Sequence, residues 1–128
     1  MNRKHFFMLC IIGLLSCKDQ EYSFQINNQT NFYLNEVLFD WCNNNKKISL
    51  KPYSTTEIRL KYRPKITNIF GTGSLCITIL TYSDTNSTYH NNTGVSFERK
   101  NLSKRKDNKI LITKSNFSNN KIFSITLE

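Results

Sequence analysis

Short segments in which apolar and polar residues alternate recur along this chain, and they constrain its fold more than any other feature. In Thr56–Tyr62 (TEIRLKY), charged residues separate Ile58, Leu60 and Tyr62. Successive side chains of a strand point to opposite faces, so this pattern predicts a strand with one buried face. No helical periodicity of useful length follows Cys17. We therefore predict an all-β protein.

Turn residues such as Asn43–Asn45, Pro52–Ser54 and Gly71–Gly73 separate these segments. The predicted strands are Tyr22–Asn27, Leu34–Cys42, Lys47–Leu50, Thr56–Tyr62, Leu75–Tyr82, Gly94–Arg99, Lys109–Thr113 and Ile122–Leu127. The polar stretch Ser83–Thr93 is interpreted as a loop. About seven to eight short strands predict an antiparallel β-sandwich, immunoglobulin-like or transthyretin-like, with a small barrel as the alternative.

The N-terminal segment has the features of a secretory signal. Arg3 and Lys4 precede the apolar run Phe6–Ser16, which is shorter than the roughly 20 residues of a membrane-spanning helix. The run ends in Leu14-Leu15-Ser16-Cys17, which resembles the lipobox of bacterial lipoproteins. That resemblance implies diacylglycerol on the Cys17 thiol and cleavage just before it, so that a signal helix over Met1–Ser16 is removed.

The residues after Cys17 bear on localisation. Lys18-Asp19-Gln20-Glu21 resembles the export signal of Bacteroidota surface lipoproteins. The residue after the cysteine is not Asp, and the resemblance to the enterobacterial pattern then implies the outer membrane, facing the periplasm or exposed at the surface. The 128-residue chain has room for one domain. We predict a signal peptide over 1–16, a lipidated tether over 17–21 and a single β-sandwich over 22–128.

Two further cysteines, Cys42 and Cys76, remain in the exported domain. Each lies out of phase with the apolar residues of its predicted strand, so both should face away from the core. This phase disfavours a bridge between sheets. It allows a disulfide between neighbouring strands of one sheet, with two free thiols as the alternative. A metal site built from Cys42, Cys76 and His90 lacks the close spacing of metal ligands.

The sequence shows no motif of an enzyme or of a cofactor site. His90 is the one histidine after Cys17, and it falls in a predicted polar loop. A lone loop histidine is more often a solvated side chain than a general base. No nucleophile elbow, P-loop or Gly-rich nucleotide turn is present. We therefore predict a non-enzymatic domain without catalytic, cofactor or metal residues, and a weaker hypothesis is a small exported enzyme that uses His90.

The chain is strongly basic, with a formal net charge of +9. The candidate patch for an anionic partner consists of Arg59, Lys61, Arg63, Lys65, Lys104, Arg105 and Lys106, and the last three lie in a run that also holds Arg99, Lys100 and Lys109. Suitable partners are an anionic glycan, lipopolysaccharide or an acidic protein. A solvated face that protects a sheet edge is the alternative.

These observations lead to two main hypotheses. The first is a lipid-anchored, monomeric lipoprotein whose β-domain binds a protein or glycan partner without catalysis. The second is a structural envelope lipoprotein whose basic surface faces the anionic membrane. Nucleic acid is disfavoured because the chain is predicted to be exported and lacks an aromatic and basic platform for bases.

Overall fold

The computed structural model describes residues 20–41, 44–62, 73–116 and 121–128. The expected signal helix over Met1–Ser16 lies outside them. The strands are β1 (Gln20–Asn28), β2 (Tyr33–Trp41), β3 (Asn44–Leu50), β4 (Thr55–Tyr62), β5 (Leu75–Ser83), β6 (Thr88–Phe97), β7 (Asn108–Lys114) and β8 (Phe123–Leu127), and a 3-10 helix, η2, spans Arg99–Asn101. The described part of the chain is therefore all-β, as predicted.

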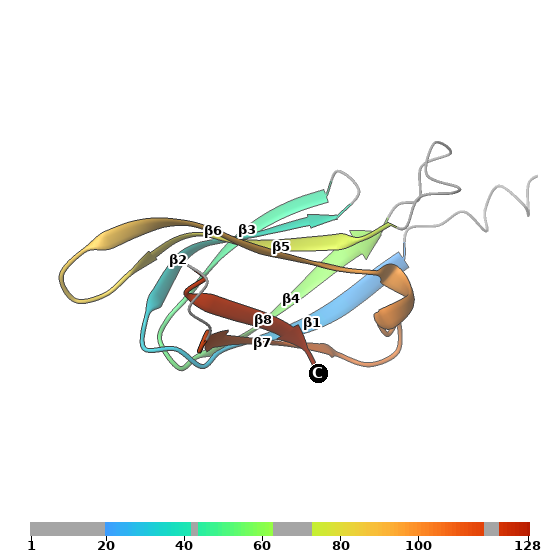
Figure 1. Cartoon of the computed structure of the whole chain (residues 1–128). Coiled ribbons are helices and arrows are strands. Elements are labelled where there is room, and N and C mark those ends of the chain that lie inside the picture. Colours follow the sequence, from blue (N-terminus) through green and yellow to red (C-terminus); the bar gives the residue numbers. More distant parts are fainter. Residues whose placement is uncertain (1–19, 42–43, 63–72, 117–120) are drawn as a thin grey trace, which may run out of the picture.

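The strands form two sheets of four, in the orders β4-β1-β7-β8 and β3-β2-β5-β6 (Figure 1). The predicted β-sandwich is confirmed. Its pairs are antiparallel except that β1 runs parallel to β7, with Phe24 opposite Asn108. The orders differ from the ABED and CFG sheets of an immunoglobulin constant domain. The immunoglobulin-like alternative is therefore not supported by the strand order, and the transthyretin-like one stays a prediction.

The core between the sheets follows from the alternation in the sequence. Residues Val37, Phe39 and Trp41 of β2 are fully buried, and they pack against buried residues of β1 and β4. Trp41 lies at one end, with its ring centroid 4.7 Å from that of Tyr22 and 5.0 Å from that of Tyr62. Aromatic rings in such arrangements stabilise the fold by more than the burial of their apolar area alone would. The strand faces predicted for β2, β4 and β5 are therefore confirmed.

The largest differences from the predicted boundaries are at the starts of β6 and β3, whereas the other ends shift by one or two residues. Thr88–Thr93 was expected in a loop but belongs to β6, because a tight turn at Asp84–Ser87 brings Thr88 opposite Ser83. β6 lies at the edge of its sheet, and its inward residues are only half-buried. An edge strand whose inner face is only partly buried needs few apolar residues, so its sequence resembles that of a loop. β3 likewise begins at Asn44, within the predicted turn, because Asn44 pairs with Trp41.

Candidate functional site

A basic loop follows β6 and spans residues 98–107. The buried side chain of Asn108 fixes this loop from below: its Oδ1 accepts the N–H of Ser103 at 2.6 Å, and its Nδ2 donates to the Ser103 carbonyl at 2.9 Å. The same Nδ2 donates to the carbonyl of Ser23 on β1 at 3.1 Å. Ser103 Oγ in turn accepts the N–H groups of Arg105 and Lys106. The loop is therefore tied to the sandwich through the partly buried hydrogen bonds of Asn108.

This loop borders an open depression of about 410 Å³. Its lining residues are Tyr22, Arg99, Lys100, Leu102, Ser103, Lys104 and Arg105. Burial raises the pKa of the Tyr22 hydroxyl, and the positive charge of Arg99 acts in the opposite direction. Leu102 is buried and anchors the loop to the core. The depression therefore combines four cationic side chains with a tyrosine at its base, a composition suited to phosphate or carboxylate groups.

The four cations differ in how they are held. The Arg99 guanidinium lies 4.5 Å from the centre of the Tyr62 ring, a cation–π arrangement that fixes its position. Lys100 Nζ lies 3.0 Å from a carboxylate oxygen of Glu98. Lys104 and Arg105 are exposed and form no ion pair with any residue that the structure describes. These two are therefore the charges most available to an anionic ligand.

The other predicted basic residues lie on or beyond β4. Arg59 and Lys61 point outward from β4, and Arg59 pairs with Glu21 of β1 at 3.5 Å. Arg63 and Lys65 lie outside the described residues. Figure 1 shows the start of β1, the end of β4 and the basic loop at one end of the sandwich. We call this end, with Arg59, Lys61 and the loop 98–107, the basic end.

The sequence identified the basic run but not the hollow that it borders. Tyr22 was assigned only to a strand, and Arg99 and Lys100 were noted without being included in the candidate patch. Their cationic character was a usable signal. The contribution of Tyr22 could not be predicted, because its position in the depression depends on the parallel pairing of β1 and β7, which no local pattern reveals.

The remaining candidates do not form a chemical site in the described structure. Cys76 is exposed and forms no disulfide with any described residue, and its Sγ lies 3.3 Å from Ser96 Oγ. Cys42 lies outside the described residues, so the Cys42–Cys76 disulfide stays a prediction. His90 lies on β6 opposite Thr81, not in a loop, and its side chain is exposed. Within the described ranges, no three metal-ligating side chains of His, Cys, Asp or Glu gather at one place.

Among residues 20–41, 44–62, 73–116 and 121–128, no helix is long and apolar enough to cross a membrane.

No known protein family, curated protein or solved structure matches this chain.

Proposed function

We propose that this protein is a non-enzymatic lipoprotein of the bacterial envelope, anchored by lipid on Cys17 and held with its basic end against anionic lipid headgroups. The observation that carries the proposal is the position of the basic end. β1 begins at Gln20, directly after the short segment that follows Cys17. The basic loop lies at that same end of the sandwich.

The distance from the proposed anchor supports this arrangement. Two residues separate Cys17 from Gln20, the first residue of β1, and each of the three steps along an extended chain spans roughly 3.5 Å. The start of β1 would then lie about 10 Å from the lipidated cysteine, which is close to one Debye length at physiological salt. Charges at this distance interact with an anionic surface.

The expected energy of each charge contact indicates how strongly the basic end would bind the membrane. A Lys or Arg near an anionic membrane surface contributes about 1 kcal/mol. Lys104 and Arg105 are available for such contacts, whereas Arg59 and Lys100 are paired with Glu21 and Glu98. The loop alone would then bind weakly and reversibly. The acyl chains on Cys17 would supply the stable attachment, and the basic end would set the orientation of the domain.

Vesicle flotation tests the role of the basic end. The full chain carrying Cys17→Ser should float with vesicles that contain phosphatidylglycerol at low salt and stay behind at high salt or with neutral vesicles. Replacing Lys104, Arg105 and Lys106 with Ser should weaken flotation by about tenfold to a hundredfold. A matched control replaces Lys51, Lys114 and Lys121, which lie outside the basic loop, with Lys114 at the end of β7. Equal loss in both triple variants would reduce the effect to net charge and contradict the proposal.

A second function is favoured by the hollow beside the loop. A flat membrane does not require a depression of about 410 Å³, whereas an anionic glycan or an acidic side chain of a partner protein could enter one. Salt-sensitive pulldown from envelope extract separates the two functions. A discrete component that co-purifies with the wild-type protein, and not with the Lys104, Arg105 and Lys106 variant, would favour this second function. Recovery of bulk lipid alone would favour the first.

A further inference from the structure

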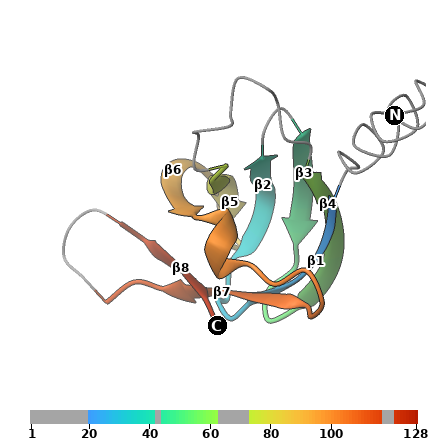
Figure 2. The same ribbon diagram turned by 90° about the vertical axis from the view of Figure 1, so that its right-hand side faces the viewer.

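The two lateral edges of the sandwich differ in a way that points to a second binding surface. The strand orders place β3 and β4 at one side and β6 and β8 at the other (Figure 2). Within each pair the two edge strands approach each other. Each edge strand uses one side of its backbone for its sheet neighbour. No described strand pairs with its other side, which could therefore pair with an additional strand.

The β3/β4 side carries the usual protection against such pairing. β3 includes Lys46 and Lys47, and β4 includes Glu57, Arg59 and Lys61. Charged side chains on exposed edges keep other strands from adding to a sheet. β6 (TYHNNTGVSF) and β8 (FSITL) contain no Asp, Glu, Lys, Arg or Pro. The β6/β8 side therefore lacks the charges that protect the opposite side.

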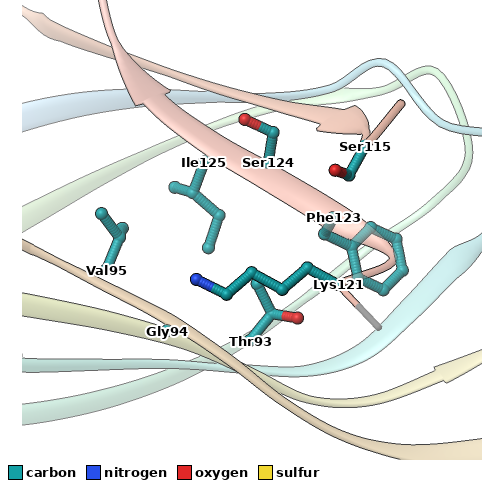
Figure 3. A pocket seen from close by; sticks show the side chains of 8 residues that line it. All are labelled: Thr93, Gly94, Val95, Ser115, Lys121, Phe123, Ser124 and Ile125. Atoms are coloured by element: carbon teal, nitrogen blue, oxygen red, sulfur yellow. The ribbon is translucent and has the colours of Figure 1, made fainter. Parts of the chain in front are cut away.

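A groove of about 340 Å³ lies between β6 and β8 (Figure 3). Its lining residues are Thr93, Gly94, Val95, Ser115, Lys121, Phe123, Ser124 and Ile125. Phe123 and Ile125 are buried and form an apolar floor, whereas Val95 is half-buried and points into the groove. The groove thus has an apolar floor with polar residues around it, beside the outer edge of β6.

β6 is less covered than the central strands of its sheet. The inward residues Thr93, Val95 and Phe97 are half-buried, whereas the apolar inward residues of the central strands β2 and β5 are buried. The facing strand β8 has five residues against ten in β6, so it cannot cover the whole inner face. An added strand would bury apolar surface in addition to forming backbone hydrogen bonds.

The charge at the groove indicates what kind of strand fits. Lys121 extends along the groove (Figure 3), and it forms no ion pair with any described residue. An acidic side chain on the incoming segment would complement it. A second copy of this chain is a poor occupant because the protein has a formal net charge of +9, and a large net charge opposes self-association.

We propose that the groove between β6 and β8 accepts an extended segment of a partner protein, which adds to β6 as a strand. One of its apolar side chains enters the pocket formed by Val95, Phe123 and Ile125, and an acidic residue pairs with Lys121. This surface is separate from the basic end. The proposal therefore does not depend on lipid attachment or on the membrane.

Selection from a library of random short peptides tests the proposal on the full chain carrying Cys17→Ser. Selected peptides should alternate apolar and polar residues and include an acidic one. Val95→Lys should weaken their binding by about tenfold or more, because a buried unpaired charge is costly. The matched control is Ile48→Lys, which places the same charge at a half-buried position on the opposite edge strand β3 and should leave binding unchanged.

Two further measurements separate strand addition from simple apolar contact. In a strand, alternate N–H groups point to opposite sides, so N-methylation of one alternate set of peptide amides should abolish binding while methylation of the other set should not. Lys121→Glu, at an exposed position, should shift selection from acidic to basic peptides even if Val95→Lys does not fold. Equal effects of the two methylated sets would overturn the proposal. So would a failure to select any peptide, or a dimer of the chain that Val95→Lys dissociates.

Discussion

The side-chain amide of Asn108 holds the backbone of Ser103 at two points, accepting its N–H at 2.6 Å and donating to its carbonyl at 2.9 Å. Because the same amide also donates to the Ser23 carbonyl, one buried side chain joins the basic loop to β1. The position of Lys104 and Arg105 at the basic end therefore depends on a residue that carries no charge.

Asn108→Ala should release the loop and lower stability together. The substitution leaves the Ser103 N–H and two carbonyls without their partners, which we expect to cost about 2–3 kcal/mol of unfolding free energy. Urea denaturation measures this loss. The control is Asn101→Ala in the same loop, where the side chain is exposed and a change within about 0.5 kcal/mol is expected. Similar losses for both variants would argue against the role assigned to Asn108.

Gly73→Ala should be strongly destabilising. Gly73 has φ +57°, and an added Cβ would lie 2.7 Å from Tyr62 Oη. Its carbonyl also accepts a hydrogen bond from the indole N–H of Trp41 at 2.6 Å, so a shift of the Gly73 backbone would weaken that bond. We expect a cost of about 2–4 kcal/mol from backbone strain and steric overlap combined. Fluorescence of Trp41, the one tryptophan of the chain, reports unfolding.

The matched control for this prediction is Gly94→Ala. Gly94 has an ordinary strand conformation, and the nearest atom to an added Cβ is Thr78 Oγ1 at 3.1 Å. A side-chain hydroxyl can move more easily than a packed ring, so the loss should be clearly smaller than at Gly73. If Gly94→Ala costs as much as Gly73→Ala, the left-handed backbone is not the cause.

Much of the sandwich could be predicted from the sequence because its central strands alternate strongly. Leu75, Ile77 and Ile79 are buried while Cys76 between them is exposed, as a period of two requires. β6 could not be predicted in full. It lies at an edge and the side chains on its inner face are only partly buried, so polar residues such as Asn91 and Thr93 are tolerated there.

The basic end was only partly predictable for a different reason. The charge of Lys104, Arg105 and Lys106 is evident in the sequence, but the hollow beside them requires Tyr22, which lies far away in the chain. Long-range pairing of β1 with β7 brings them together. The groove between β6 and β8 is still less visible, because it depends on which two strands end the sheets.

Tyr53→Gly should stabilise the protein slightly. Tyr53 has φ 53° and is 73% exposed, so its ring contributes little packing while its backbone is in the left-handed region. Relief of about 1–2 kcal/mol of strain is offset by the greater flexibility of Gly in the unfolded chain, roughly 0.5–1 kcal/mol. A net gain of about 0.5–1 kcal/mol is expected by urea denaturation. Tyr53→Ala keeps the strain and should give no gain.

The turn between β5 and β6 should make stability sensitive to acid. Hydrogen bonds from the N–H groups of Asn86 and Ser87, both 2.8 Å long, lower the pKa of the Asp84 carboxyl. A carboxyl whose pKa is lower in the folded protein than in the unfolded chain stabilises the folded state. This stabilisation is complete at pH values above the unfolded pKa and is lost as the pH falls through the folded pKa. Asp84→Asn should therefore reduce the loss of stability below about pH 4.

Comparison with Tyr89→Phe isolates the cause of this acid sensitivity. Tyr89 donates one hydrogen bond to Asp84 at 3.2 Å, and its removal leaves both backbone bonds in place. The variant should keep most of the acid sensitivity. Urea midpoints measured across the acid range, with the Asp84 titration followed by NMR, provide the test. If Tyr89→Phe abolishes the effect, the backbone bonds are not its main source.

Cys17→Ser should move the protein from the membrane fraction to the soluble fraction at physiological salt. Serine has no thiol for the thioether, and the basic loop without acyl chains would hold the domain only by screened charge. Fractionation of wild-type and variant cells, followed by immunoblotting, measures the distribution, and circular dichroism of the released protein should show the same β-sheet content. Ser16→Ala is the matched control, because alanine is also small, and it should leave the protein in the membrane fraction. Should the Cys17→Ser protein remain membrane-bound in high salt, the lipid anchor would be wrong.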